Sequence, residues 1–293
     1  MRWFHVLGAV LLTLVLSFVS LSLISNFIAP LSPASLAQGR VAAAPGASTS
    51  AIPALPPAPT SPPGSESPAF AGVTVPILLY HAIGEYEGVG EELFVSAAIF
   101  EQQLDYLVWA GFTTITLEQW WQHLENGAPL PAKPIIISFD DGYRSFYNYA
   151  MPALLARDMK ATLFIISNHI TLPRTMTPGM IRDAYDMGME IASHSANHLD
   201  LVSCSPAEVL PQLVESKEFL EGIIRVPVYY LAYPGGIYND FVVAAAQEAG
   251  YRLAAGTVPG LNSSATDYMQ LHRILIQRSH DLVGFVHKLE EYP

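Results

Sequence analysis

The stretch IIISFDDG, residues 135–142, is the part of the sequence that decides the fold. A continuous apolar run without polar alternation is typical of a strand that is covered on both faces, as in a parallel sheet. Asp140 and Asp141 follow the run directly, and Gly142 permits a sharp exit from the strand. Two adjacent carboxylates at a buried strand end are costly unless positive charge lies beside them. A solvated Asp-Asp-Gly turn is the alternative interpretation.

Short apolar runs of this kind alternate with helical patterns from residue 73 onward. They predict strands at residues 77–80, 113–117, 135–139, 161–166, 190–193, 229–233, 253–255 and 273–276. Helix starts are predicted where a capping residue precedes a periodic run, at Ser96, Thr177, Ser205 and Asn239. Seven or eight β–α units in one domain predict an α/β fold, an irregular parallel (β/α) barrel of seven or eight strands.

Two histidines follow the predicted strand 190–193. If this stretch forms a helical turn, His194 and His198 lie on one face, which suits a shared metal ion. With a carboxylate from another strand end they would supply two nitrogens and one oxygen. Such a set leaves open positions for water and substrate, as catalytic rather than structural metal sites do. Histidines of a surface loop are the alternative.

Two other strand ends carry candidate residues. His81 closes the predicted strand 77–80, although a single histidine there is more often structural than catalytic. Pro234-Gly235-Gly236 follows the strand 229–233, and a tight turn of this composition exposes backbone N–H groups of the kind that an oxyanion needs. An ordinary strand-to-helix turn is the alternative for this second segment.

The composition narrows the possible partners. The formal net charge of −12 argues against a surface that grips phosphate backbones, so no nucleic acid is expected. It is compatible with a polymer that is neutral or cationic. Cys204 is the only cysteine, which excludes an intrachain disulfide. Nothing in the sequence indicates an oligomeric state.

The first quarter of the chain differs in composition from the rest. Residues 6–29 form an uncharged apolar run long enough to span a bilayer, so residues 1–29 are interpreted as a transmembrane anchor or a signal segment. Ser35-Leu36-Ala37 is a possible cleavage site for the second case. Residues 30–72 are rich in Pro, Ala and Ser and are predicted to be a disordered linker. Residues 73–293 then form the folded domain, which is exported and held at the membrane, or secreted if the segment is cleaved.

The Phe-Asp-Asp-Gly and His-x-x-x-His segments resemble the NodB-type polysaccharide deacetylases, carbohydrate esterase family four, in their order and roughly fifty-residue separation. VPILLYHAIG, FEQQLDYLVWAGF and AYPGGIYN resemble the branch that includes the poly-β-1,6-N-acetylglucosamine deacetylases. The resemblance covers residues 75 to about 276. It implies a metal-dependent hydrolase that removes acetyl groups from N-acetylglucosamine residues of an extracellular polysaccharide.

The resemblance also implies roles for individual residues. Asp141, His194 and His198 match the family's ligands for a divalent metal, usually Zn²⁺. Asp140 matches the base that takes a proton from the attacking water. In the shifted-motif branch the histidine after the first strand is the general acid, which His81 matches. The family's oxyanion donor, a backbone N–H just after a proline, falls on Gly235.

Two departures from the commoner family pattern stand out. The Arg-x-Pro-Tyr motif is replaced by Ala232-Tyr233-Pro234-Gly235, and a clear late Leu-x-x-His acid is absent, although His280 and His287 lie near that end. Arg273 is a candidate to pair with Asp140 in place of the missing arginine, and a plain structural salt bridge is an equal alternative.

Other substrates and another class of protein are left open by the sequence. Peptidoglycan, chitin fragments or acetyl esters on xylan would use the same chemistry. A catalytically inactive sugar-binding module would keep the fold, but inactive members usually lose the first aspartate or a metal-binding histidine. Asp140, Asp141, His194 and His198 are all present here, which favours an enzyme.

Overall fold

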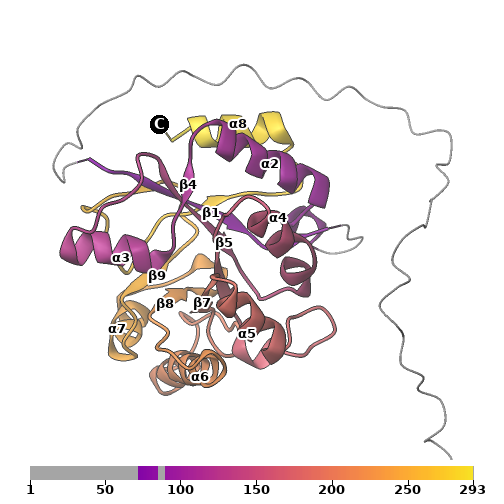
Figure 1. Ribbon diagram of the computed structural model, residues 1–293. Coiled ribbons are helices and arrows are strands. Elements are labelled where there is room, and N and C mark those ends of the chain that lie inside the picture. The colour runs from indigo at the N-terminus through magenta and orange to yellow at the C-terminus, as the bar shows by residue number, and fades with distance from the viewer. Residues whose placement is uncertain (1–71, 85–89, 293) are drawn as a thin grey trace, which may run out of the picture. The chain divides into compact units, whose positions relative to one another are not determined.

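The computed structural model of the chain describes residues 72–84 and 90–292 (Figure 1). The predicted anchor or signal segment, residues 1–29, and the predicted linker up to residue 71 lie outside the described residues, as does the possible cleavage site. Within the described residues, no helix combines the length and the apolar character needed to cross a bilayer.

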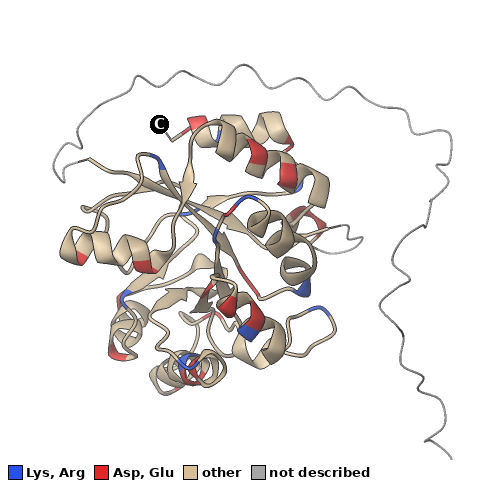
Figure 2. Cartoon of the chain, viewed as in Figure 1, with Lys and Arg blue, Asp and Glu red and all other residues tan. Residues whose placement is uncertain are grey.

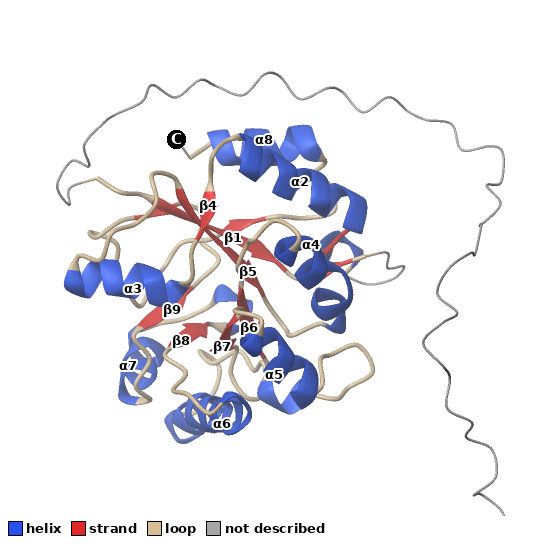
Figure 3. Cartoon of the chain, in the orientation of Figure 1, coloured by secondary structure: helices blue, strands red, loops and turns tan. Residues whose placement is uncertain are grey.

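A curled sheet of mostly parallel strands forms the centre of the fold (Figure 1 and Figure 3). In hydrogen-bonded order its parallel strands are β11 (Ile274–Leu275), β1 (Val75–Tyr80), β5 (Pro134–Phe139), β6 (Thr162–Ile165), β7 (Glu190–Ser193), β8 (Tyr230–Ala232) and β9 (Leu253–Ala255). Two short strands pair at the starts of others: β4 (Thr113–Thr114) runs parallel to β5, and β10 (Leu261–Asn262) antiparallel to β1. A separate parallel pair is formed by β2 (Ala82–Ile83) and β3 (Phe94–Val95).

Regular strand pairing runs from β11 to β9 and forms a half-barrel. Beyond β9, Leu271 donates its N–H to Ala254 O and accepts the N–H of Gly256, both at 2.9 Å. The same segment continues into β11, which pairs with β1. The predicted α/β class and parallel sheet are therefore confirmed, whereas the predicted barrel is only partly correct. Its last strand is reduced to two residues, and a single bridge replaces regular pairing with β9.

Helices cover the outside of the sheet (Figure 1). The α-helices are α2 (Ala97–Trp109), α3 (Leu117–Asn126), α4 (Met151–Leu155), α5 (Pro178–Asp186), α6 (Pro206–Ile224), α7 (Asp240–Glu248) and α8 (Leu282–Glu290). Shorter turns are the 3₁₀ segments η1 (Glu91–Leu93), η3 (Ser167–His169) and η4 (Pro234–Gly236) and the π-helix η2 (Phe146–Ala150). Figure 2 shows acidic positions on α2 and α8, which pack against each other.

The predicted helix starts are confirmed, and one predicted strand is wrong in part. Ser96, Thr177 and Asn239 each accept a hydrogen bond from an N–H in the first turn of the helix that follows. The strand predicted at 113–117 ends at Thr114. Thr116 instead caps α3, because its hydroxyl accepts the N–H of Gln119 at 3.2 Å in a capping box.

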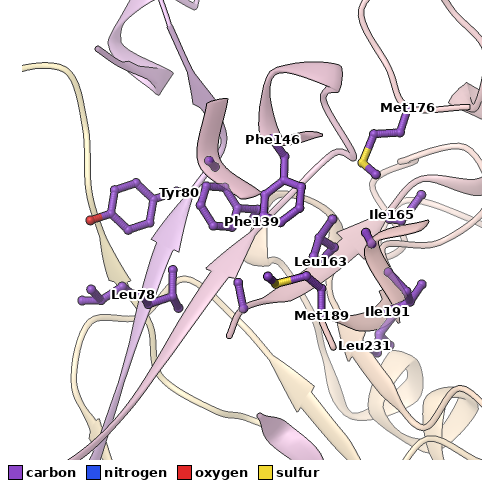
Figure 4. Close-up of a cluster of buried hydrophobic side chains, with 14 of the residues drawn as sticks. Leu78, Tyr80, Phe139, Phe146, Leu163, Ile165, Met176, Met189, Ile191 and Leu231 are labelled. Carbon is purple, nitrogen blue, oxygen red and sulfur yellow. The ribbon is translucent and has the colours of Figure 1, made fainter. Parts of the chain in front are cut away.

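Strand side chains alternate between two buried layers. The outer layer lies between the sheet and the helices and includes Leu78, Phe139, Leu163, Ile191 and Leu231 (Figure 4). The inner layer, inside the curl, includes Ile77, Ile136, Phe164, Ala192 and Tyr230, packed with Trp120 of α3. Every second residue of a strand points inward. The inward-facing positions of β1, β5 and β7, which include Ile77, Ile136 and Ala192, therefore continue to His81, Asp140 and His194. The alternation thus directs these three polar residues to the carboxyl end of the curled sheet.

Candidate active site

Asp140 lies at the end of β5, almost fully buried, with 3% of its surface exposed. The guanidinium of Arg273, which is completely buried, donates from Nη1 to Oδ1 at 2.7 Å and from Nη2 to Oδ2 at 2.9 Å. Burial works to raise the pKa of Asp140, but the charges of Arg273, His194 and His81 and the Arg273 hydrogen bonds outweigh it and lower this pKa to about 2. Asp140 is therefore ionised at neutral pH.

A third hydrogen bond fixes the orientation of Arg273. Its Nε donates to the carbonyl oxygen of Gly256 at 2.8 Å. The guanidinium also lies 5.3 Å from the centre of the Phe164 ring in the inner layer. Arg273 is thus held on three sides, and its planar fork presents two donors to the carboxylate of Asp140. Gly256 could not be identified from the sequence, because its contribution is a backbone carbonyl.

The chain turns sharply after β5, at Asp141 and Gly142. Asp141 and Gly142 both have positive φ, 71° and 70°. A side chain at Gly142 would lie 3.2 Å from Ile165, so both the conformation and the space favour glycine. The turn brings Asp141 Oδ1 to 3.6 Å from His194 Nε2 and 3.8 Å from His198 Nε2.

The two histidines meet through a loop and not through the helical turn considered from the sequence. Ser195 and His198 have φ values of 63° and 56°, which no α-helix contains. The hydroxyl of Ser195 accepts the N–H of His198 at 3.1 Å and fixes this loop. The imidazole rings lie 4.8 Å apart between their centres at 71°. A helical turn was one way to bring the rings together, and a loop with two left-handed residues is another.

Asp141, His194 and His198 together have the chemistry of a metal site. Their ligand atoms all lie within 4.8 Å of one another, and the 3.6 and 3.8 Å separations are near the roughly 3.4 Å that bonds of ~2.1 Å give in a tetrahedral site. His194 Nδ1 lies 2.8 Å from the carbonyl oxygen of Ala232, so Nδ1 carries the proton and Nε2 keeps a free lone pair. Burial lowers the pKa of His194, which favours the neutral ring that a metal needs.

His81 follows β1 and is half-buried. Its Nδ1 is buried and has no hydrogen-bond partner among the described residues. His81 is close enough to Asp140 for its charge to lower the pKa of that carboxyl. The structure therefore brings His81 to the same end of the sheet as Asp140.

The two histidines considered as alternatives to His81 lie elsewhere. His280 Nδ1 accepts the N–H of Gln277 at 2.9 Å, and its carbonyl oxygen accepts the side-chain amide of Gln103 on α2. His287 belongs to α8, which packs on α2 outside the sheet. His280 thus helps to dock the C-terminal segment on α2, whereas His287 is exposed on α8.

Gly235 lies in the turn after β8, beside the strand whose Ala232 carbonyl bonds to His194. Gly235 is exposed, with φ 61°, and Gly236 has φ 71°. A side chain at Gly236 would lie 2.2 Å from the hydroxyl of Thr257, so this position holds only glycine without a shift of Thr257. The turn therefore places an exposed backbone at the same end of the sheet as His194.

Comparisons with known proteins agree with this arrangement. Residues 127–254 match the family model described as polysaccharide deacetylase. The Bacillus subtilis protein YxkH, provisionally named a polysaccharide deacetylase, is 30% identical over 202 residues, which cover 69% of this chain and 71% of that protein. The structure of the Streptococcus pyogenes deacetylase PplD in complex with acetate is 29% identical, with a TM-score of 0.69, and the match covers 74% of this chain and 98% of PplD.

Two relatives with named substrates match shorter parts of the chain. The Bacillus cereus peptidoglycan-N-acetylglucosamine deacetylase is 31% identical over 125 residues, 42% of this chain and 56% of that protein. The Staphylococcus aureus poly-β-1,6-N-acetyl-D-glucosamine N-deacetylase is 26% identical over 172 residues, 54% of this chain and 59% of that protein. The chain thus spans somewhat more than half the length of these two. The fold, the site and the match to YxkH together show that this chain belongs to the polysaccharide deacetylase family.

Proposed function

We propose that this protein is a metal-dependent hydrolase that removes acetyl groups from N-acetylglucosamine residues of an extracellular polysaccharide. The observation that carries the proposal is the set of Asp141, His194 and His198 lying beside an Asp140 carboxylate that Arg273 holds ionised. Such a set can hold a divalent metal, which we propose to be Zn²⁺ from its two imidazole ligands and one carboxylate. When bound, the metal would polarise the acetyl carbonyl and make a nearby water more acidic.

In the proposed reaction Asp140 acts as the general base. Its two oxygens are fixed by the guanidinium of Arg273, and Oδ2 lies 3.7 Å from His194 Nε2, at the edge of the ligand set. A base in this place can take a proton from a water that attacks the acetyl carbon. Arg273 then has a positioning role, because it holds the carboxylate ionised and in one orientation.

His81 and Gly235 are proposed to act on the other atoms of the amide. An amine leaves only after its nitrogen gains a proton, and we assign the donation of that proton to the imidazolium of His81. Its partnerless buried Nδ1 and its place beside Asp140 support this role. The N–H of Gly235 is proposed to donate to the acetyl oxygen as negative charge develops on it. Acid, base and oxyanion donor thus come from three different strand ends.

The substrate is proposed from the two relatives with named substrates, which both act on N-acetylglucosamine. The proposed polymer is poly-β-1,6-N-acetylglucosamine, because the segments after β1 and β8 resemble that branch and His81 fits its acid. Peptidoglycan is the second candidate, supported by the 31% identity to the Bacillus cereus enzyme over 125 residues.

We also propose that residues 1–29 carry the domain out of the cytoplasm and hold it at the membrane, with residues 30–72 as a spacer. The uncharged apolar run supports this location. Immunoblots of cell fractions should find the full-length protein with the membrane, accessible to external protease. A soluble form shortened to about residue 38 would instead indicate cleavage after Ser35-Leu36-Ala37.

Acetate release from a panel of glycans tests the activity. The purified protein, supplied with Zn²⁺, should release acetate from oligomers of β-1,6-linked N-acetylglucosamine, and less from peptidoglycan, chitin oligomers and acetylated xylan. Chelation should stop the release and added Zn²⁺ should restore it. Binding of these glycans without acetate release from any of them would contradict the proposal and would indicate a sugar-binding module.

A further inference from the structure

A hollow opens at the edge of the sheet beyond β9. It has a volume of about 450 Å³ and lies between the turn after β8 and the loops that follow β9. Its walls include Tyr238 and Val258 on one side and Asp267, Gln270 and His272 on the other. None of the roles proposed above uses these residues.

The hollow and the active site share a wall. The ring of Tyr238 packs 4.8 Å from that of Tyr233 and covers Gly256, where a side chain would come within 2.9 Å of the ring. The carbonyl oxygen of this same Gly256 accepts the hydrogen bond from Arg273 Nε. His272, on the opposite side of the hollow, directly precedes Arg273 in the chain. A side chain at Gly256 would also lie 3.4 Å from the carbonyl oxygen of Gly236, so this wall adjoins the exposed turn at Gly235.

The lining has the mixed character that a sugar ring requires. Tyr238 offers an aromatic face, and Val258, with 53% of its surface exposed, offers an apolar one. The hydroxyl of Tyr238 and the side-chain amide of Gln270 offer hydrogen bonds, and at 3.5 Å they bond each other only weakly. A few placed polar groups on an apolar lining are typical of a small-molecule site.

Asp267 gives this hollow a negative charge in a fixed position. Its Oδ1 accepts the N–H of Met269 and its Oδ2 accepts the Gln270 amide, both at 2.9 Å. Burial raises the pKa of Tyr238, and the charge of Asp267 raises it further, so the carboxylate lies near that ring. Among the described residues that line the hollow there is no lysine or arginine. A cationic group is therefore the better partner for this wall.

We propose that the hollow binds a glucosamine residue of the polymer, one that has already lost its acetyl group, and that Asp267 pairs with its ammonium. The inference rests on the proposed function, because the reaction proposed above is what creates the ammonium. A chain that carries a glucosamine next to an intact N-acetyl group would then bind better than a fully acetylated one. Deacetylation would consequently spread from residues already modified and produce clusters of glucosamine.

Binding measured in the presence of a chelator, which stops acetate release, isolates this site from the reaction. At pH 7, where an amine is mostly protonated and a histidine mostly neutral, calorimetry on the whole protein should show tighter binding of tetraglucosamine than of tetra-N-acetylglucosamine. Asp267→Asn keeps an acceptor for Met269 and removes the charge, so it should weaken tetraglucosamine binding roughly three- to tenfold and leave the acetylated oligomer unchanged. Glu248→Gln on α7, exposed and outside the hollow, removes the same charge and should change neither.

Tyr238→Ala provides a second variant with a different expected pattern. Loss of the aromatic face should weaken both oligomers to a similar extent, whereas Asp267→Asn affects only the cationic one. The inference is wrong if wild-type protein binds tetraglucosamine no better than the acetylated oligomer, or if Glu248→Gln weakens binding as much as Asp267→Asn. Acetate release is measured separately, so a protein that binds tetraglucosamine as expected but releases no acetate would contradict the proposed function and not the site.

Discussion

Each end of the curled sheet holds a carboxylate in the inner register, Asp140 buried and Glu190 partly buried, and the two carboxylates have opposite surroundings. Asp140, at the carboxyl end, faces the guanidinium of Arg273. Glu190, at the amino end of β7, accepts hydrogen bonds from the N–H groups of Leu117 and Glu118 at the start of α3 and from the Thr162 hydroxyl. Neutral hydrogen-bond donors thus surround Glu190, whereas a cation lies beside Asp140.

This difference gives the two groups opposite pKa shifts. Burial raises the pKa of Glu190 to about 7, against the hydrogen bonds that work to lower it. Burial acts in the same direction on Asp140, but Arg273 reverses the result and the pKa falls to about 2. A buried carboxylate that is to serve as a base at neutral pH therefore needs its cation. Glu190, which is partly buried and caps the start of a helix, does not need one.

The largest effect is expected from removal of a metal ligand at the carboxyl end. His194→Ala should lose bound metal, because two protein ligands rarely hold zinc in a site open to water. Deacetylation should fall by roughly 10³-fold or more, since the charge stabilisation supplied by a metal is worth several kcal/mol. Metal analysis and acetate release measure the two effects, with Glu190→Gln as a control at the amino end that should keep both. Full zinc occupancy in His194→Ala would refute the assignment.

Separate substitution of the two adjacent aspartates by asparagine should show which is the base and which is the metal ligand. Asp140→Asn should keep its metal while deacetylation falls by roughly 10²- to 10⁴-fold, because the base is lost and the ligand set is intact. Asp141→Asn should instead reduce metal content. If Asp140→Asn empties the site and Asp141→Asn does not, the two roles are reversed.

His81→Ala should have a smaller effect that depends on the leaving group. On N-acetylglucosamine oligomers, whose amine needs a proton to leave, activity should fall roughly 10²-fold. On an aryl acetate, which leaves as a stable phenolate, the loss should be much smaller, with metal content unchanged. Equal losses on both substrates would mean that His81 shapes the site without donating a proton.

The residues of the site could be found from the sequence because each follows an apolar run that is readable as a strand. Parallel strands bring their carboxyl ends to one edge, so Asp140, His194 and His81 could be expected together without knowledge of any loop. Arg273 was placed beside Asp140 only as one of two alternatives, since a single arginine near a short strand does not reveal its partner.

What could not be predicted depends on backbone conformation and on contacts between distant segments. The loop at Ser195 and His198 requires two left-handed residues that the sequence does not mark with glycine or asparagine. The role of Gly256 rests on a carbonyl oxygen, which every residue has. The apolar residues around Thr116 predict a strand up to residue 117, although a capping box of Thr116 with Gln119 marks the start of α3 in the same stretch.

The smallest expected effect concerns Glu190 and the stability of the domain. Its pKa of about 7 in the folded protein lies above the value of about 4.5 for an exposed glutamate, so between these two values the folded state binds more protons than the unfolded one. The free energy of unfolding should therefore decrease as pH rises from about 4.5 to 7, by about 1–3 kcal/mol from this group. Glu190→Gln lacks the titration and should lack this part of the decrease.

Urea unfolding of both proteins at pH 5, 6, 7 and 8 tests this expectation. Other titrating groups are common to the two proteins, so the difference between their unfolding free energies isolates Glu190. Glutamine can accept only one of the two N–H groups of Leu117 and Glu118, and the wild type should be the more stable protein at pH 5, with an advantage that shrinks towards pH 8. An advantage that grows with pH would mean that the helix start of α3 stabilises the ionised carboxylate more than burial disfavours it. The amino end would then resemble the carboxyl end, with the helix terminus in the place that Arg273 takes beside Asp140.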